Sequence, residues 1–257
     1  MTTPRILVTN DDGIYSEGLK MLAAALRRVG EVVVIAPDRE QSAASHALTL
    51  NHPLRLIQLG ESEWIVDGTP SDCVNLGVLH LLKDRRPDMV VSGINFGPNL
   101  GDDVTYSGTI SAAFEGALLG IPSIAFSALV GESFSFEPCA RFAADLAALA
   151  LGQERDPSVV WNVNFPVAAF EGVRITKLGK RIYTEGVIER VDPRGRKYFW
   201  IGGDPPSWHQ AEGTDFEAVG GGYISITPLH LDLTHHPSLA RLKELEGELG
   251  RIASRTP

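Results

Sequence analysis

Two adjacent carboxylates, Asp11 and Asp12, end a short apolar run near the start of the chain, and Gly13 follows them. The run over residues 6–9 is typical of a buried strand, and open α/β sheets bind ligands beyond the carboxyl ends of their strands. Neighbouring carboxylates there repel each other unless a cation lies between them, and they favour hard ions such as Mg²⁺ or Mn²⁺. The alternative is a turn that caps the next helix, for which Asp and Gly are well suited.

Two further strand ends are expected to bring oxygen ligands to the same edge of the sheet. Ser42 follows the second expected strand, and Asn95 ends a later one. A hydroxyl and an amide oxygen, added to two carboxylates, would hold a cation and leave positions open for water or substrate, as Mg²⁺ prefers. Each residue alone also fits a structural role, Ser42 as a helix cap and Asn95 as a residue that turns the chain. The combination predicts a catalytic metal site formed by Asp11, Asp12, Ser42 and Asn95.

A glycine-rich loop over residues 96–108 leads into a helix that we expect from about 109 to 119. Loops of this length in a compact domain are usually functional. The first amide groups of a helix are unpaired donors, and with the macrodipole and nearby hydroxyls they bind anions. The loop is neither a P-loop nor a dinucleotide fingerprint, and an ordinary Ser/Thr cap is the alternative. The candidate substrate-binding residues are Asn99, Ser107, Gly108 and Thr109.

Three other polar residues near these motifs have roles that the sequence leaves open. Asp102 and Asp103 lie in the glycine-rich loop and would oppose an anion unless they face solvent or another group. His46 lies close to Ser42 in the sequence and is a candidate general acid. The chain contains no G-x-S-x-G elbow and no H-E-x-x-H motif, which argues against esterase and zinc-peptidase chemistry.

Composition argues against several classes of partner. The 257 residues include 23 Lys and Arg against 32 Asp and Glu, and the net charge of -9 repels nucleic-acid polymers and anionic lipid. Cys73 and Cys139 form no CxxC pair, so we expect buried thiols rather than a disulfide framework or a zinc site. The start of the chain lacks a signal-peptide pattern, and the long apolar stretch over 143–151 is interrupted by Asp145. We therefore expect a cytoplasmic protein that does not enter a membrane.

Apolar periodicity predicts an α/β fold that opens with a strand, a helix over residues 16–29 and a second buried strand over 31–35. Residues 54–66 are typical of a hairpin, and residues 67–72 of a turn with a helix cap. Further strands are expected at 88–95, 122–127, 159–165, 173–176 and 223–227, and further helices at 74–82, 138–151 and 239–249.

The pattern changes after residue 166, where two β-like runs over 182–190 and 197–201 flank the turn signal Asp-Pro-Arg-Gly at 192–195. Such an extended hairpin has little core of its own, so it is expected to pack on another part of the molecule or on a second subunit. Its apolar residues are Ile182, Val187, Ile188, Phe199 and Ile201.

Several motifs in their order along the chain resemble the SurE family, the survival-protein-E nucleotidases. The resemblance covers most of the chain, and the ordered set is far more specific than any single member. At two places the chain departs from the family pattern without losing a candidate ligand, with Ala43-Ala44 and Ile110-Ser111 where the family commonly has glycine. The motifs are those at residues 8–13, 36–42, 67–70, 92–95, 106–109, 162–166, 213–215 and 222–228.

The resemblance implies one domain over residues 1–257, with a Rossmann-like, mostly parallel sheet flanked by helices over 1–166. A C-terminal extension over 167–257 would carry the hairpin arm, a final strand and a helix, and would help to build a homodimer or homotetramer. The implied activity is that of a divalent-metal-dependent phosphatase acting on nucleoside 5'- or 3'-monophosphates, with one Mg²⁺ or Mn²⁺ per subunit. The family's metal ligands fall on the residues gathered above, Asp11, Asp12, Ser42 and Asn95.

Phosphomonoester hydrolysis is therefore the first functional hypothesis, with Asp11 and Asp12 as catalytic residues. A cation held there would polarise a phosphoryl oxygen and activate a water, while the helix end at 107–109 would stabilise the added negative charge. Direct attack by an Asp remains an alternative. The competing hypotheses are a non-catalytic nucleotide-binding module and a transferase that uses a metal-bound nucleotide sugar. Base and sugar preference and the physiological metal remain open.

Overall fold

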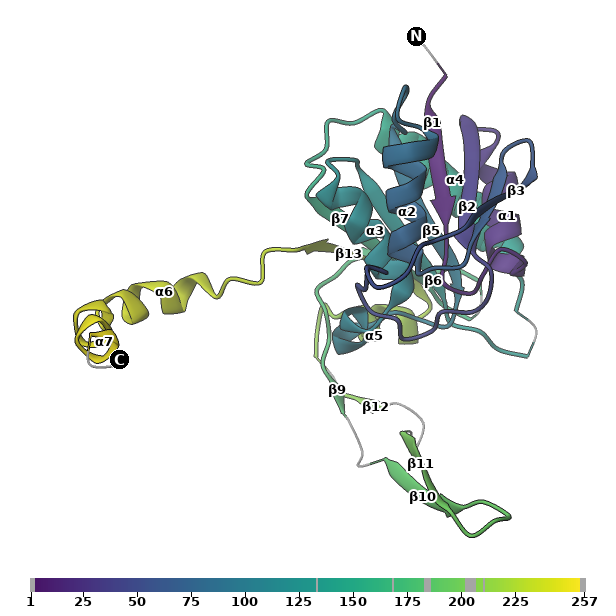
Figure 1. Ribbon diagram of the computed structural model, residues 1–257. Coiled ribbons are helices and arrows are strands. Elements are labelled where there is room, and N and C mark those ends of the chain that lie inside the picture. The colour runs from purple at the N-terminus through teal and green to yellow at the C-terminus, as the bar shows by residue number, and fades with distance from the viewer. Residues whose placement is uncertain are drawn as a thin grey trace.

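The computed structural model describes residues 3–132, 134–167, 169–182, 186–201, 207–209 and 211–254. Within them a nine-stranded sheet has the order β3-β4-β2-β1-β5-β6-β7-β13-β8, with helices on both faces (Figure 1). Its strands are β1 (Arg5–Thr9), β2 (Glu31–Pro37), β3 (Leu56–Gly60), β4 (Glu63–Val66), β5 (Met89–Phe96), β6 (Ser123–Ala128), β7 (Val159–Phe165), β8 (Gly172–Ile175) and β13 (Tyr223–His230).

The sheet is mostly parallel, which confirms the expected α/β fold. Strands β4, β2, β1, β5, β6 and β7 pair in parallel, whereas β3 pairs antiparallel with β4, and β13 pairs antiparallel with β7. Both faces of the central strands are covered, which explains why they appear as continuous apolar runs rather than alternating patterns.

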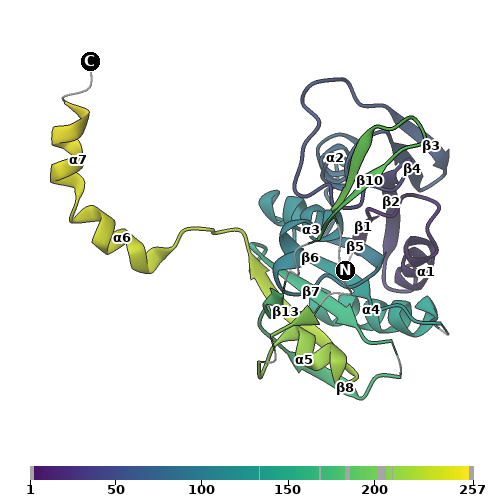
Figure 2. The same ribbon diagram turned by 90° about the horizontal axis from the view of Figure 1, so that it is seen from below.

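Helices α1 (Glu17–Leu26) and α4 (Phe136–Leu151) pack together on one face of the sheet, and α2 (Pro70–Leu76) and α3 (Gly108–Leu118) pack on the other (Figure 2). The alternation of side chains along β1 assigns the faces, since Ile6 and Val8 belong to the core under α1 and α4, and Leu7 belongs to the core under α2. The loops that leave the carboxyl ends of β1, β2 and β5 are thereby directed to one edge of the sheet.

The predicted start of α2 has a specific cap. The Thr69 hydroxyl accepts a hydrogen bond from the backbone N–H of Asp72, and the Asp72 carboxylate accepts one from the N–H of Thr69. Pro70 occupies the first turn, where its missing N–H costs nothing. The helix then widens into a π-helical turn, η1 (Gly77–Leu81), instead of continuing as a regular α-helix to residue 82.

Short elements at three places differ from the sequence-based expectations. The glycine-rich loop contains a 3-10 turn, η2 (Gly101–Thr105), and a short helix, α5 (Asp215–Gly220), precedes β13. The single C-terminal helix expected over 239–249 is instead two helices, α6 (His236–Lys243) and α7 (Glu246–Ala253). Neither helix contains a buried residue, so no packing surface enforces one continuous axis.

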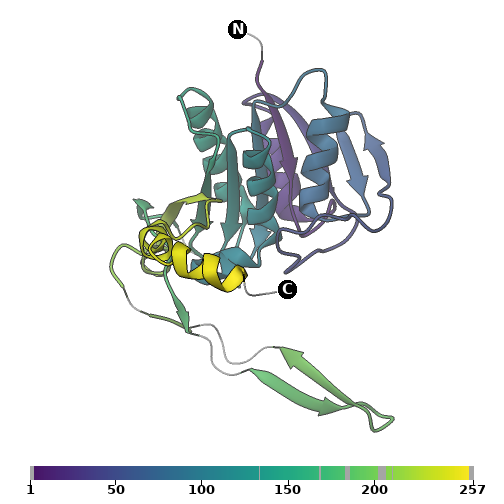
Figure 3. The same cartoon turned by 60° about the vertical axis from the view of Figure 1, so that its left-hand side comes forward.

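The hairpin consists of β10 (Val187–Val191) and β11 (Lys197–Ile201), which pair antiparallel and extend away from the body (Figure 3). At its root β9 (Arg181–Ile182) pairs with β12 (Ser207–Trp208). The sequence-based run over 182–190 also covers residues 183–185, which lie outside the described residues.

Two other expectations concern buried thiols and membranes. Cys73 and Cys139 are both buried and free, as expected for small apolar packing residues. Among the helices that the structure describes, none is long and apolar enough to cross a bilayer.

Candidate active site

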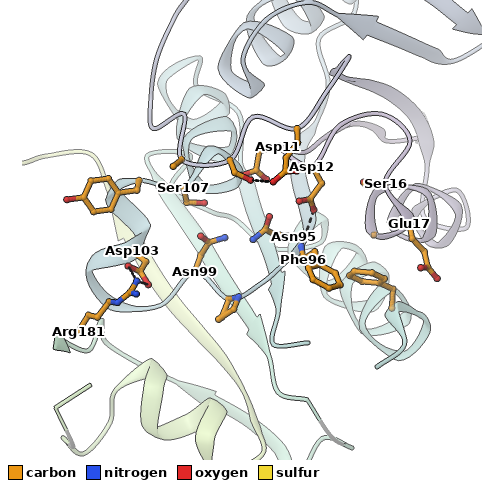
Figure 4. Close-up of a pocket in the computed structure, with 17 residues that line it drawn as sticks. Asp11, Asp12, Ser16, Glu17, Asn95, Phe96, Asn99, Asp103, Ser107 and Arg181 are labelled. Atoms are coloured by element: carbon orange, nitrogen blue, oxygen red, sulfur yellow. Dashed lines mark hydrogen bonds and ion pairs between the residues drawn. The ribbon is translucent and has the colours of Figure 1, made fainter. Parts of the chain in front are cut away.

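The carboxyl ends of β1, β2 and β5 surround a cavity of about 660 Å³ (Figure 4). Six of the residues expected from the sequence lie in its wall, although they come from four separate segments of the chain. The structure therefore brings together the candidate ligands and part of the candidate phosphate site. These residues are Asp11, Asp12, Ser42, Asn95, Asn99 and Ser107.

Asp11 lines this cavity and is 5% exposed. The Thr109 hydroxyl donates a hydrogen bond to Oδ1 of Asp11. Burial is the main cause that raises the pKa of Asp11 to about 6, and the neighbouring charge of Asp12 adds to it. A Cβ atom at Gly108 would come within 2.8 Å of the Asp11 side chain, so glycine allows the start of α3 to approach this carboxylate.

Asp12 is the more accessible of the two carboxylates. Its Oδ2 accepts a hydrogen bond of 3.0 Å from the backbone N–H of Phe96, which connects the end of β1 to the end of β5. Burial raises the pKa of Asp12, the Phe96 hydrogen bond lowers it, and the charge of Glu40 raises it further. Both carboxylates therefore resist ionisation in the metal-free protein, and a cation between them would reverse that tendency.

Ser42 lies on the exposed loop that follows β2, where its hydroxyl donates a hydrogen bond to the Glu40 carboxylate. The loop is joined to β1 because the N–H of Gln41 donates to the carbonyl of Asp11 over 2.8 Å. Glu40 also lines the cavity and was missed by the sequence analysis, although its position two residues before Ser42 offered a signal.

Asn95 is the penultimate residue of β5 and lies beside the two carboxylates (Figure 4). Its Nδ2 donates a hydrogen bond of 2.8 Å to the carbonyl of Gly97, which leaves the amide oxygen as the group suited to a cation. The register between β5 and β6 shifts between Ser92 and Asn95, and such irregularities redirect side chains next to functional sites.

A buried asparagine cluster holds Asn99 in the cavity wall. The backbone N–H of Asn99 donates to Oδ1 of Asn164 over 2.8 Å, and its carbonyl accepts from Nδ2 of Asn162 and Asn164 over 2.8 and 3.0 Å. Its own Nδ2 donates to the hydroxyl of Ser127 over 2.7 Å. The sequence analysis quoted residues 162–166 as a motif but did not predict that they hold Asn99, because Asn99 lies more than sixty residues earlier in the chain.

The start of α3 supplies the cavity with a capped helix end. The Ser107 hydroxyl accepts a hydrogen bond of 3.1 Å from the N–H of Ile110, and Ser107 itself lines the cavity. Thr109 is fully buried and its hydroxyl is directed to Asp11. Of the predicted phosphate-binding group, Asn99 and Ser107 reach the cavity with their side chains, whereas Thr109 acts on a carboxylate.

The carboxylates of the glycine-rich loop face an arginine rather than the phosphate site. Nη1 of Arg181 donates to both carboxylate oxygens of Asp103 over 2.6 and 2.7 Å, and the N–H of Arg181 donates to Oδ2 of Asp102 over 3.3 Å. Asp103 and Arg181 both line the cavity, so the root of the hairpin forms part of its wall (Figure 4). The sequence analysis missed Arg181, because nothing in the spacing links it to a residue 78 positions earlier.

His46 lies outside the cavity wall, and its Nε2 is 2.8 Å from Oε2 of Glu115. This position gives no geometric support to a role as general acid. Across the described part of the chain, no three His, Cys, Asp or Glu side chains are grouped so that they could hold a metal ion. A cation at Asp11 and Asp12 would therefore need neutral oxygen ligands as well, and Ser42 and Asn95 line the same cavity.

The fold and the site define an α/β protein with paired carboxylates and a capped helix end at one edge of a parallel sheet, an oxygen-rich donor set that fits a hard divalent cation. The sequence pattern of the family described as survival protein SurE matches residues 6–185. The chain belongs to the SurE family, which confirms the resemblance found in the sequence.

Curated relatives match nearly the whole chain. The 5'-nucleotidase SurE of Geobacter sulfurreducens is 54% identical over 242 residues, which cover 93% of this chain and 92% of the relative. The 5'-nucleotidase SurE of Aquifex aeolicus is 46% identical over 247 residues, which cover 95% of this chain and 98% of the relative. The crystal structure of the SurE protein from Aquifex aeolicus superimposes with a TM-score of 0.84 at 44% identity, covering 95% of this chain and all of that one.

Proposed function

We propose that this chain is a divalent-metal-dependent 5'-nucleotidase that hydrolyses nucleoside monophosphates to nucleoside and phosphate. The observation that carries this proposal is the pair of carboxylates, Asp11 and Asp12, that share one cavity with the capped start of α3. The names of the relatives support the class of reaction, since each is called a 5'-nucleotidase at about half sequence identity.

In this proposal Asp11, Asp12, Ser42 and Asn95 hold one Mg²⁺ or Mn²⁺ ion. Such an ion supplies Lewis-acid stabilisation of phosphoryl oxygens and lowers the pKa of water. The donor set fits because it consists of oxygen atoms only, and because the raised pKa values of both carboxylates favour a partner of positive charge.

The remaining residues bind and orient the substrate. The N-terminal end of α3 places the positive end of its dipole near a phosphoryl group bound beside Ser107. Asn99 presents a polar side chain to the same cavity from a backbone fixed by Asn162 and Asn164. Thr109 fixes the orientation of the Asp11 carboxylate through its hydrogen bond to Oδ1.

A phosphate-release assay tests this function. Each nucleoside 5'- and 3'-monophosphate is incubated with Mg²⁺, with Mn²⁺ and with chelator, and the Asp12→Asn variant is the control for contaminating phosphatase. Release that requires metal and is lost in the variant supports the proposal. A protein that binds nucleotides but releases no phosphate with any metal is a binding module, and cleavage of nucleotide sugars without free phosphate indicates a transferase.

We also propose that the protein, with its core over residues 1–166 and its extension over residues 167–257, forms a homodimer or homotetramer. The hairpin of the extension would pack on a second subunit. In the single chain Val187 is 68% exposed and Ile201 is 94% exposed, and neither has a core to pack against. Strands with exposed apolar side chains are stabilised by a partner surface, and a second copy of the chain is the partner that symmetric assembly favours.

A further inference from the structure

The loop that carries Ser42, residues 38–49, which we call the Ser42 loop, has a backbone that needs external support. Ala43 and Ser45 have φ values of 56° and 53°, which is the left-handed region that side chains other than glycine rarely adopt. Such conformations persist when surrounding contacts hold them. The loop also contains no regular helix or strand. Its shape, and therefore the position of Ser42, depends on contacts with other elements.

Near Ser42 the loop makes backbone contacts with two segments that line the cavity, those of Asp11 and Tyr106. Besides the hydrogen bond from Gln41 to Asp11, the N–H of Ser45 donates to the carbonyl of Tyr106 over 3.1 Å. The hydroxyl of Ser45 donates to the carbonyl of Thr105 over 2.9 Å. The contact of the Ser45 hydroxyl is solvent-exposed, and both Ser45 contacts reach the end of the short turn η2.

His46 gives the loop a side-chain contact with α3, whereas Ala47 and Thr49 form hydrogen bonds with Thr69 and Asp72 at the start of α2. Nε2 of His46 lies 2.8 Å from Oε2 of Glu115, a residue of α3 that is 6% exposed. The other carboxylate oxygen of Glu115 accepts a hydrogen bond of 2.8 Å from Nδ2 of Asn75 on α2. Burying a carboxylate without hydrogen bonds destabilises the folded state. Both the His46 and the Asn75 contacts of Glu115 are therefore expected to be maintained in the folded protein.

Glu115 lies outside the cavity wall and takes no part in the proposed chemistry. Helix α3, which carries it, begins at the proposed phosphate site and reaches Asp11 through Thr109. The contact between His46 and Glu115 therefore attaches the Ser42 loop to the same rigid helix that orients the Asp11 carboxylate.

We infer that His46 is a positioning residue for metal binding, which holds Ser42 at the cavity through its hydrogen bond to Glu115. This inference rests on the proposed metal site. Without the contact the loop would populate conformations in which Ser42 is displaced, and the apparent affinity for the ion would fall by the fraction of molecules that remain competent. The maximal rate at saturating metal would be retained, because the ligands themselves are unchanged.

Calorimetric titration of the full-length protein with Mn²⁺ tests this inference. His46→Ala should raise the Mn²⁺ dissociation constant about tenfold or more, if one molecule in about ten keeps the loop in place. His46→Gln should restore most of the affinity, because its amide can donate to Glu115 from near the position of Nε2. The matched control is His52→Ala, since His52 is exposed just beyond the same loop and its ring contacts the carbonyl of Pro53 instead of Glu115.

Amide hydrogen exchange over residues 41–46 of the metal-free protein is the second readout. Exchange there should be faster in His46→Ala than in the wild type or in His52→Ala, whereas exchange in β1 should not change. If His46→Ala does not fold, both measurements are repeated with His46→Asn, whose shorter side chain also cannot reach Glu115.

Three results would overturn the inference. An unchanged dissociation constant with a lower melting temperature would assign His46 to stability alone, and an unchanged constant with a lower maximal rate would assign it to the chemical step. Exchange that is equally slow in wild type and variant would show that the loop does not depend on His46. A wild-type protein that binds no Mn²⁺ would refute the proposed function, and the exchange result would still decide whether His46 holds the loop.

Discussion

The buried carboxylate of Asp11 makes the metal-free protein sensitive to pH. Burial raises its pKa from the ordinary value of 3.8 to about 6, so between these values the folded protein keeps a proton that the unfolded chain releases. The free energy of unfolding therefore falls as the pH rises from about 4 to about 6. One pKa unit corresponds to about 1.36 kcal/mol, so the whole difference amounts to about 3 kcal/mol for this group.

Replacing Asp11 with Asn removes the charge and keeps the shape of the side chain. The amide oxygen can still accept the hydrogen bond from Thr109, while nothing remains to ionise. In the presence of chelator, the variant should be more stable than the wild type by up to about 3 kcal/mol above pH 6, and equal to it near pH 4. The residue that the proposed chemistry requires is thus expected to destabilise the empty protein.

Urea unfolding at a series of pH values between 4 and 8 measures this difference. Asp84→Asn is the matched control, because Asp84 is an exposed carboxylate in a turn outside the cavity wall and should give a difference near zero at every pH. Added Mn²⁺ should reverse the order above pH 6, since an ion that binds only the folded state stabilises the wild type. A difference between Asp11→Asn and wild type that does not vary with pH would refute the reasoning.

Three further predictions concern metal affinity, substrate affinity and assembly. Ser42→Ala and Asn95→Ala should raise the metal concentration for half-maximal phosphate release more than they lower the maximal rate, because neutral oxygens bind hard ions less strongly than carboxylates; unchanged metal titrations would remove both from the site. Asn164→Asp removes a donor to the Asn99 carbonyl, and the loss of a hydrogen bond to such a buried group costs about 1–3 kcal/mol. The variant should therefore have a higher KM, which a substrate titration measures. Deletion of residues 187–201 should yield a smaller species in sedimentation, and an unchanged oligomer would place the hairpin on its own chain.

Much of the site could be predicted because parallel strands share their carboxyl edge. Asp11 and Asn95 are far apart in the sequence, yet each ends an apolar run, and β1 and β5 are neighbours in the sheet. The end of a strand can be recognised from the local sequence, and the carboxyl ends of parallel strands lie at one edge of the sheet. These two facts were enough to predict that both residues share one site. The hydroxyl of Ser107 was predictable for the same reason, as the cap of a helix that follows a polar loop.

The contacts that support these residues could not be predicted. The bonds of His46 with Glu115, and of Asp103 with Arg181, join positions 69 and 78 residues apart, and no periodicity connects their partners. Thr109 illustrates the same limit, since a helix-start hydroxyl suggested an anion ligand and the structure directs it to Asp11. The division of the C-terminal helix depends on the lack of a packing surface, which a pattern of apolar residues does not reveal.

The central claim is that one divalent cation binds between Asp11 and Asp12 at the carboxyl edge of the sheet. Anomalous diffraction at the manganese edge, from crystals soaked in Mn²⁺, tests it most directly. The account predicts one strong peak in the cavity at roughly 2 Å from carboxylate oxygens of both residues, with Ser42 and Asn95 as further neighbours. A saturated crystal of an active protein with no peak there, or with its peak outside this cavity, would contradict the account.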